Sequence, residues 1–371
     1  MNMSEPTQFR AEGLRGEMLR DEPMSRHVSW RAGGVAHRVY QPADLADLQT
    51  FLRQAPADEP MLAVGLGSNL LVRDGGFRGT VLLLLGGLAE LRGEGDLIYA
   101  QAGVAGAKLA RFAATNHLCG AEFFVGIPGT LGGMLAMNAG CYGGETWRRV
   151  VRVQVLTRTG ELLERAPQEY EIGYRHVALR KGSRDTVGRS PLVRERLPCT
   201  SSRNRLASPV TCRRCSRDTV GRSPLVRERL PCTSSRNRLA SPVTCRRCSE
   251  EFFVGAWLKF EQGNAEVARQ QIKALMEKRS ASQPLQLPNC GSVFRNPPGS
   301  HAAKLIESCG LKGKRIGGAE VSEKHANFIV NIGGASAADI EDLIEEVQAT
   351  VLRQTGVKLH TEVKIVGEYQ S

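Results

Sequence analysis

Four cysteines form two C-x-x-C pairs, Cys212 with Cys215 and Cys245 with Cys248, in an arginine-rich stretch. Thiolates at this spacing can bind zinc, and arginines beside them can contact nucleic acid. The pairs belong to a 33-residue segment, Ser183 to Cys215, that is repeated letter for letter at Ser216 to Cys248. The spacing C-x2-C-x29-C-x2-C exceeds that of common zinc ribbons, and the second pair follows from the duplication. We therefore predict no metal site.

The repeat distorts the composition of the whole chain. Each copy holds eight arginines and two acidic residues, so the two copies together carry the entire net charge of +12. The other 305 residues hold 34 basic and 34 acidic side chains and only four of the ten cysteines. The copies have no aromatic residue and no apolar periodicity, so we expect a disordered tandem insertion at residues 183–248. Without aromatic residues to stack on bases, nucleic-acid binding is disfavoured.

A first glycine-rich run lies in MLAVGLGSNLLVRDGGFRGTVLLLL, which starts at Met61. We predict that a strand enters this run, that RDGG forms a turn and that a second strand covers about Thr80 to Leu85. A G-x-G-x-x-G fingerprint would need a glycine in place of Leu70 and a helix after it, so the classical Rossmann interpretation is rejected. Small residues here still let backbone N–H groups approach a phosphate. The residues expected to do so are Gly65, Gly67, Ser68 and Asn69.

A second run, GAEFFVGIPGTLGGMLAMNAGCYGGE, spans Gly120 to Glu145 and follows a predicted amphipathic helix near Lys108 to His117. No lysine completes a nucleotide-hydrolysing P-loop. Alone, each run could be a tight connection without a ligand, but two such runs in a neutral domain favour a bound nucleotide cofactor. The predicted contacts in this run are Gly126, Ile127, Pro128, Gly129, Thr130, Gly132, Gly133, Asn138 and Gly140.

The elements that position these runs belong to an ordinary globular protein of 371 residues, enough for two or three domains. The first 27 residues contain no apolar stretch typical of a signal peptide, and no segment is apolar enough to span a membrane. We expect a cytoplasmic protein with reduced thiols and no membrane partner.

Six motifs occur in the order WRAGGVAHRVYQP, VGLGSNLLVRDGG, EFFVGIPGTLGGMLAMNAGCYGGE, GYRH, NCGSVFRNP and HTEVKIVGE. Together they closely resemble the UDP-N-acetylenolpyruvoylglucosamine reductase family, over about Met24 to Glu368 apart from the repeat. The resemblance implies an α+β fold: an FAD-binding domain of the vanillyl-alcohol-oxidase type followed by an α/β substrate-binding domain.

The resemblance also implies domain bounds. An N-terminal segment (1–27) would precede the FAD-binding domain (28–263, interrupted by 183–248), and the substrate-binding domain would follow (264–371). The strand EEFFVGAWLKF would pass directly into a helix at Ala265 to Arg279, which is typical of the shorter subclass. FAD would lie along the two glycine runs, and NADPH would supply the hydride. No particular oligomer is required.

Three catalytic residues follow from the resemblance to this family, whose substrate is the enolpyruvyl ether of a UDP-sugar. Arg175 in GYRH would hold a carboxylate through its planar, permanently charged guanidinium, although Val177 replaces the usual Ser of this motif. Ser292 in NCGSVFRNP would donate a proton to the substrate carbon, and Glu362 in LHTEV would help to stabilise the enolate.

Further predicted substrate or nicotinamide contacts are Tyr174, Arg279, Asn296, Lys312 and His325. Two other functions stay open at this level. One is a related FAD-linked oxidoreductase that acts on a hydroxy acid. The other is an arginine-rich nucleic-acid-binding or zinc-binding protein built around the repeat.

Overall fold

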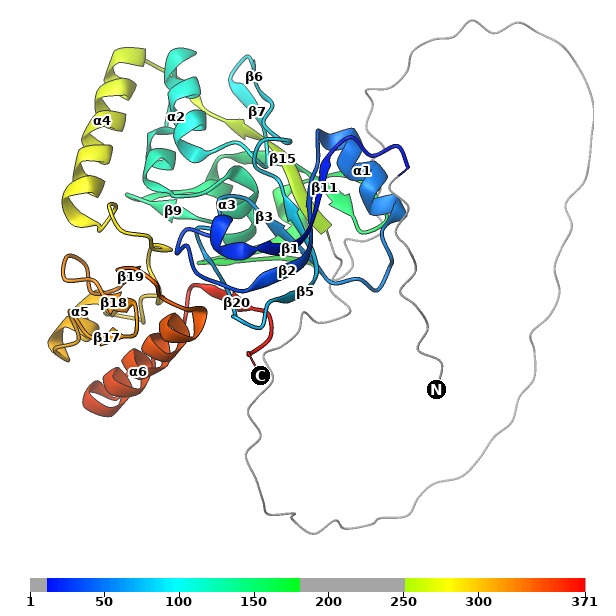
Figure 1. The fold of residues 1–371 in the computed structure, drawn as a ribbon. Helices are drawn as coiled ribbons and strands as arrows, with labels where there is room; N and C mark the ends of the chain where they lie inside the picture. Colours follow the sequence, from blue (N-terminus) through cyan, green and yellow to red (C-terminus); the bar gives the residue numbers. More distant parts are fainter. Residues whose placement is uncertain (1–11, 181–250, 371) are drawn as a thin grey trace, which may run out of the picture. The chain divides into compact units, whose positions relative to one another are not determined.

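The computed structural model describes residues 12–180 and 251–370, which all belong to one compact unit (Figure 1). The tandem repeat and its paired cysteines lie outside the described residues. The predictions of disorder, of a tandem insertion and of no zinc site there stay predictions.

A four-stranded sheet comes first, in the order β1-β2-β5-β3. β1 runs antiparallel to β2, whereas β2 and β3 both run parallel to β5. Helix α1 (Leu45–Gln54) provides the crossover that parallel strands need. Its N-cap is Asp44, whose carboxylate accepts a hydrogen bond from the Asp47 N–H. The strands are β1 (Glu17–Pro23), β2 (Val35–Gln41), β3 (Met61–Val64) and β5 (Phe77–Leu83), and a short 3-10 helix, η1 (Met24–Arg26), follows β1.

A five-stranded antiparallel sheet has the order β12-β11-β15-β7-β6. Its central strand is β15, so the first described residues after position 250 enter the middle of the sheet. The strands are β6 (Leu91–Glu94), β7 (Leu97–Gln101), β11 (Val150–Thr157), β12 (Leu162–Arg165) and β15 (Glu251–Lys259).

Helices α2 (Gly106–Thr115) and α4 (Ala265–Ser282) lie side by side (Figure 1). Leu109 of α2 and Ala268 and Ile272 of α4 belong to one buried apolar cluster with residues of the five-stranded sheet. The predicted domain boundary at residue 264 therefore precedes a helix whose buried face packs with elements of the first domain.

Short elements connect these parts and carry several predicted site residues. They are β8 (Leu118–Cys119) with its partner β16 (Glu261–Gln262), η2 (Glu122–Gly126), α3 (Leu131–Met137), β9 (Gly140–Cys141) with β10 (Gly144–Glu145), η3 (Thr146–Arg148), η4 (Pro167–Glu169), and the hairpin of β13 (Tyr170–Gly173) and β14 (His176–Leu179).

The C-terminal part contains a three-stranded antiparallel sheet, β17-β18-β19, and two helices. Its elements are α5 (Ala302–Ser308), β17 (Arg315–Ile316), β18 (Ala319–Val321), β19 (Ile329–Asn331), α6 (Ala337–Thr355) and β20 (Lys364–Val366). Ser336 and Asp339 form a capping box at the start of α6, and Gly356 ends the helix in the left-handed conformation (φ 71°).

The last strand, β20, pairs in parallel with β4 (Leu70–Val72), which directly follows the first glycine run. Beside this pair, the guanidinium of buried Arg73 donates to Glu341 of α6 at 2.7–3.2 Å, and the Asp74 carboxylate accepts from the N–H groups of Ala337 and Ala338. These contacts join the C-terminal part to the glycine run.

The elements predicted from the sequence are present. The strand from Met61, the helices near 108–117 and 265–279, and the strand EFFVGAWLK are confirmed, and β5 begins at Phe77 rather than Thr80. Within the described residues, no helix is both long and apolar enough to cross a membrane.

Candidate active site

The two glycine runs meet in the fold. A β-carbon on Gly65 would come within 2.1 Å of Thr130 Oγ1, and one on Gly129 would come within 3.4 Å of Ser68 Oγ. Side chains at Gly65 would therefore push the runs apart. Only glycine, which has no side chain, therefore fits at position 65.

The first run also provides free donors. Within the described part of the chain, the backbone N–H groups of residues 66–69 find no hydrogen-bond acceptor. Gly133 in α3 is exposed, with open space where a β-carbon would stand. Successive unpaired N–H groups beside a surface without side chains suit the diphosphate of a dinucleotide, so these residues fit the FAD predicted from the sequence.

Asn138 connects the second run to a catalytic candidate. It ends α3 in the left-handed conformation (φ 39°), and its side chain is buried. Its Nδ2 donates to the Gly173 carbonyl at 3.2 Å, and its Oδ1 accepts from the Trp147 N–H at 3.2 Å. The Asn138 amide thus supports the β13–β14 hairpin, and its contact with a cofactor stays a prediction.

Arg175 lies at the tip of that hairpin. Gly173 pairs with His176, so Tyr174 and Arg175 form the two-residue turn, and Arg175 has a φ of 53°. A bulky residue rarely adopts this left-handed conformation, and such residues cluster at functional sites. Arg175 Nε is 2.8 Å from Glu362 Oε1 in an ion pair, without the alignment of a hydrogen bond. The structure therefore brings together two predicted catalytic residues that are far apart in the sequence.

Glu362 is buried, with 8% of its side chain exposed, and not a solvent-facing strand residue. The segment around it pairs with the segment that follows Ser292: the Glu362 N–H donates to the Val293 carbonyl at 2.7 Å, and Phe294 bridges to Thr361. Asn69 Nδ2 of the first glycine run donates to the Glu362 carbonyl at 3.2 Å. Burial raises the pKa of the Glu362 carboxyl above its ordinary value, although nearby Arg175 and Arg295 oppose the rise.

Arg295 was not among the predicted site residues. Its N–H donates to the His360 carbonyl at 2.9 Å, which places it beside Glu362 across the strand pair. Its Nε is buried, and no described residue accepts a hydrogen bond from that atom. The only sequence signal for Arg295 was its position three residues after Ser292. The site therefore holds a second guanidinium near the carboxylate.

Ser292 is half-buried, and its hydroxyl has no hydrogen-bond partner among the described residues. Gly291 precedes it in the left-handed region (φ 73°). The thiol of Cys290 donates to the carbonyls of Gly67 and Leu70, and burial raises the pKa of that thiol to about 12. The buried, protonated Cys290 thus fixes the Ser292 loop against the first glycine run.

Arg279 and Tyr174 both lie close to the second glycine run. Arg279 Nη1 donates to the Val125 carbonyl at 3.3 Å, and burial lowers the pKa of Arg279. Burial raises the pKa of Cys141 to about 11, with Arg279 and Arg175 both opposing the rise, so the two guanidiniums lie near the same thiol. Tyr174 is 60% exposed next to Arg175. Its ring is free to meet a ligand.

The other predicted contacts lie in the C-terminal part. Asn296 Oδ1 accepts from the Ala302 N–H at the start of α5, which leaves its amide nitrogen available. Lys312 Nζ binds Glu307 at 2.7 Å, and His325 is close enough that Lys312 adds to the lowering of its pKa, which burial mainly causes. No hydrogen bond or ion pair joins these three residues to Arg175 or Glu362 within the described residues. Their grouping with the site stays a prediction.

In the described ranges, no three His, Cys, Asp or Glu side chains gather as metal ligands would. The side chains and backbone groups of the arrangement can bind anions and move protons. It combines a donor-lined cradle for a diphosphate, two fixed cations for an anionic substrate, and a carboxyl and a hydroxyl that can move protons.

Two family models match the chain. The one described as "FAD binding domain" covers residues 36–165, and the one described as "UDP-N-acetylenolpyruvoylglucosamine reductase, C-terminal domain" covers residues 283–366. The prediction of an FAD-binding domain followed by a C-terminal domain, in a fold of mixed helices and sheets, is confirmed.

Curated relatives match nearly the whole chain. A UDP-N-acetylenolpyruvoylglucosamine reductase of Thiobacillus denitrificans is 48% identical, and the match covers 96% of this chain and 94% of the relative. A protein of the same name from Nitrosospira multiformis is 50% identical, with 96% and 90% covered. The solved reductase of Thermus caldophilus has the same fold, with a TM-score of 0.65, 24% identity and coverage of 95% of this chain and 99% of that one.

Proposed function

The chain belongs to the UDP-N-acetylenolpyruvoylglucosamine reductase family, and from this premise we propose that it reduces the enolpyruvyl ether of UDP-N-acetylglucosamine to UDP-N-acetylmuramate, a precursor of peptidoglycan. The observation that supports this assignment best is the Arg175–Glu362 ion pair beside the glycine cradle. A fixed cation and a buried acid beside a diphosphate cradle support the binding and protonation of an anionic substrate next to a flavin. The protein is an FAD-dependent oxidoreductase.

FAD, when bound, supplies the hydride transfer between NADPH and the substrate. The groups that would hold its diphosphate are the N–H groups of residues 66–69, the backbone at Gly129 and the open surface at Gly133. Thr130 and Gly65 set the distance between the runs. The nicotinamide cofactor and the enolpyruvyl sugar would use the same face in turn.

Arg175 and Arg295 would bind the negative charge of the substrate. Reduction of the enolpyruvyl group adds a hydride to its CH2 carbon and moves charge onto the carboxylate as an enolate. A planar guanidinium that cannot lose its proton stabilises that charge more in the transition state than in the ground state. The left-handed turn holds Arg175 toward Glu362 and away from solvent.

Glu362 would donate a hydrogen bond in the reaction, and Ser292 would donate a proton. Because burial raises the pKa of Glu362, its carboxyl keeps its proton to a higher pH than an exposed glutamate does, and in that form it can donate a hydrogen bond to the enolate. The Ser292 hydroxyl, which has no described partner, would deliver a proton to the neighbouring carbon. Tyr174, Arg279, Asn296, Lys312 and His325 are proposed to contact the diphosphate, the carboxylate or the nicotinamide.

The test is an anaerobic assay in two steps on the full-length protein. We expect the purified protein to be yellow, NADPH to bleach the flavin absorbance, and the UDP-enolpyruvyl sugar to restore it. Recovery with a hydroxy acid's keto product but not with the UDP-enolpyruvyl sugar would reject the proposal. We place the protein in the cytoplasm, where this nucleotide substrate occurs, and expect activity to be independent of nucleic acid and of a particular oligomer.

A further inference from the structure

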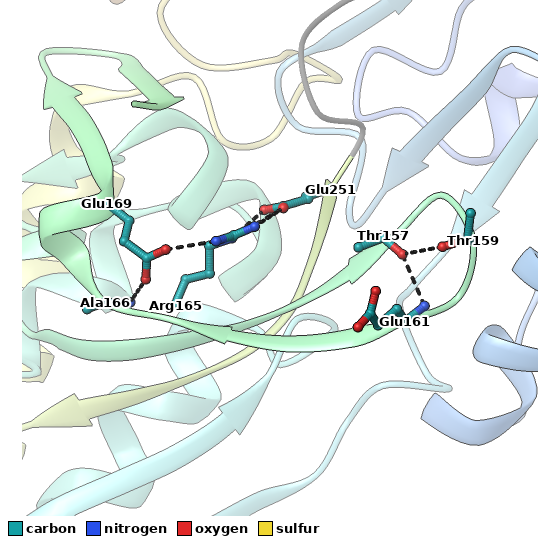
Figure 2. Close-up of polar contacts among 7 residues, drawn as sticks. All are labelled: Thr157, Thr159, Glu161, Arg165, Ala166, Glu169 and Glu251. Carbon is teal, nitrogen blue, oxygen red and sulfur yellow. Dashed lines mark hydrogen bonds and ion pairs between the residues drawn. The ribbon is translucent and has the colours of Figure 1, made fainter. Parts of the chain in front are cut away.

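Arg165, the last residue of β12, is the centre of a buried ion-pair cluster (Figure 2). Its Nε and Nη2 donate to both oxygens of Glu251 at 2.6–3.2 Å, and its Nη1 donates to Glu169 Oε2 at 2.8 Å. Only 5% of the Arg165 side chain is exposed, with 10% for Glu251 and 19% for Glu169. We call these three residues the Arg165 cluster.

The cluster joins three segments of the chain. Glu169 also accepts from the Ala166 N–H through Oε1, at 2.8 Å, and its backbone carbonyl accepts from the Arg180 N–H at 2.8 Å. Arg180 Nε in turn donates to the Tyr170 carbonyl at 3.0 Å. The end of β12, the start of β15 and both strands of the β13–β14 hairpin therefore meet at one point.

This point is the base of the hairpin whose tip carries Arg175. The four residue pairs of β13 and β14 lead from Tyr170 and Leu179 at the base to Gly173 and His176 beside the tip. The described chain stops at residue 180 and resumes at residue 251, directly at the cluster. The tip is held to the second glycine run through Asn138, and the base is held by the Arg165 cluster.

We propose that Arg165 is a positioning residue, which fixes the base of the β13–β14 hairpin so that Arg175 reaches Glu362, whatever the length of chain between residues 180 and 251. The proposal deepens the function proposed above and rests on it for its kinetic readout. We assign Arg165 no contact of its own with substrate or cofactor. It acts through the register and tilt of the hairpin.

Because the charges of the Arg165 cluster are buried, loss of Arg165 should disturb the hairpin more than loss of a residue in an exposed ion pair would. Two carboxylates share one guanidinium in a buried place, and the hydrogen bonds to Glu251 are the first cause of the raised pKa of Arg165. Removal of the guanidinium leaves two buried like charges, which separate or take up protons. Either response moves η4 or the start of β15, and the hairpin moves with them.

The experiment compares R165M, R165K and a matched control, R152M, in the FAD-bound full-length protein. Arg152 lies on the neighbouring strand β11, over the Trp257 ring, and its ion pair with Glu164 is loose at 3.7 Å. In R165M we expect reoxidation of the flavin by the UDP-enolpyruvyl sugar to slow by about tenfold or more, since a small misplacement of a catalytic group costs on the order of 10² in rate. Reduction by NADPH should change less than about twofold, and R165K should recover part of the loss.

Hydrogen exchange gives a readout that does not need activity. Amides of residues 170–179 should exchange faster in R165M than in R152M, while those of β18 and β19 should not change. Unchanged exchange in the hairpin, or equal slowing of both half-reactions, would overturn the positioning role. If the wild type is not reoxidised by the sugar, the proposed function fails, but the exchange result still decides this proposal.

Deletion of residues 183–248 tests the independence from chain length. With the cluster intact, the deletion should change the reoxidation rate by less than about twofold, well below the effect of R165M. A loss equal to that of R165M would mean that the intervening chain, and not the cluster, sets the position of the hairpin.

Discussion

At the scale of residues, the site depends on a few atoms that the chain brings from distant positions. Arg175, Ser292 and Glu362 come from a hairpin tip, a loop and a strand edge, and each is held by a contact to one of the glycine runs: Asn138 to Gly173, Cys290 to Gly67 and Asn69 to Glu362. The cradle and the catalytic groups are therefore one structure. A substitution in the cradle should therefore shift the catalytic groups, and a substitution among the catalytic groups should shift the cradle.

The hydroxyl of Ser292 can be tested by half-reactions. Ser292→Ala should slow reoxidation by the UDP-enolpyruvyl sugar by about 10²–10⁴-fold, the usual contribution of a positioned proton donor, and leave reduction by NADPH nearly normal. Stopped-flow absorbance of the flavin measures both. Ser300→Ala, on the same segment, is the control. Equal slowing of the two half-reactions would contradict the proton-donor role.

The carboxyl of Glu362 makes stability depend on pH. Its pKa is raised in the folded protein, so the folded state keeps this proton to a higher pH than the unfolded state does. The stabilisation is complete below the unfolded pKa and is lost as pH rises through the folded pKa. Relative to Glu362→Gln, the wild type should therefore lose unfolding free energy as pH rises above the ordinary pKa of a glutamate carboxyl. Urea unfolding of both FAD-bound proteins over a series of pH values would show it, and a wild type that keeps or gains unfolding free energy relative to Glu362→Gln as pH rises would refute it.

Part of the site could be predicted from the sequence. The motif order pointed to Arg175, Ser292 and Glu362 and to both glycine runs. It could not show that Glu362 is buried, because a single Glu in HTEVKIV is also typical of a solvent-facing strand. Arg295 was missed because its proximity to Glu362 arises from pairing between residues 293–295 and 360–362, and a spacing of more than 60 residues leaves no local pattern.

At the scale of elements, the pairing of β4 with β20 aligns the two parts of the site. The amphipathic helix near Lys108 to His117, with its local periodicity, was predicted to within two residues of α2. The β4–β20 pair was not, since its strands have three residues each and lie almost 300 positions apart. Such pairing is decided by tertiary packing and not by propensity.

The contact of Arg73 with Glu341 stabilises this alignment. Both side chains are about nine-tenths buried. Arg73→Met should lower the unfolding free energy by roughly 3–5 kcal/mol, since it leaves a buried carboxylate without its cation. Asp74→Ala, which removes a cap from α6, should cost only about 1 kcal/mol. Denaturant unfolding separates the two, and a cost below about 1 kcal/mol for Arg73→Met would show that the ion pair adds nothing to the alignment.

At the scale of the whole molecule, the charge and the function reside in different parts of the chain. The repeat carries all of the net charge, and the family resemblance, the cradle and the catalytic residues lie outside it. A high isoelectric point is therefore no guide to the partners of this enzyme.

Deletion of residues 183–248 should stabilise the protein. It shortens the connection between Arg180 and Glu251 from 70 residues to four. For a chain without packed structure, loop closure costs about 0.6 kcal/mol per doubling of length, so the deletion should raise the unfolding free energy by roughly 2–3 kcal/mol. Denaturant unfolding measures the change. A lower unfolding free energy, or loss of FAD, would instead assign the repeat a part in the fold.

The ion pair of Arg175 with Glu362 must change when the substrate binds. Without substrate, the Glu362 carboxylate pairs with the Arg175 guanidinium, to which a substrate carboxylate would bind. Glu362 therefore competes with the substrate for Arg175. When the substrate displaces it, Glu362 loses the nearby cation that favours its charged form, and its affinity for a proton rises. Substrate binding should therefore be accompanied by proton uptake, seen in calorimetry as a heat that varies with the ionisation enthalpy of the buffer. The substrate itself would then create the acid that its reduction needs.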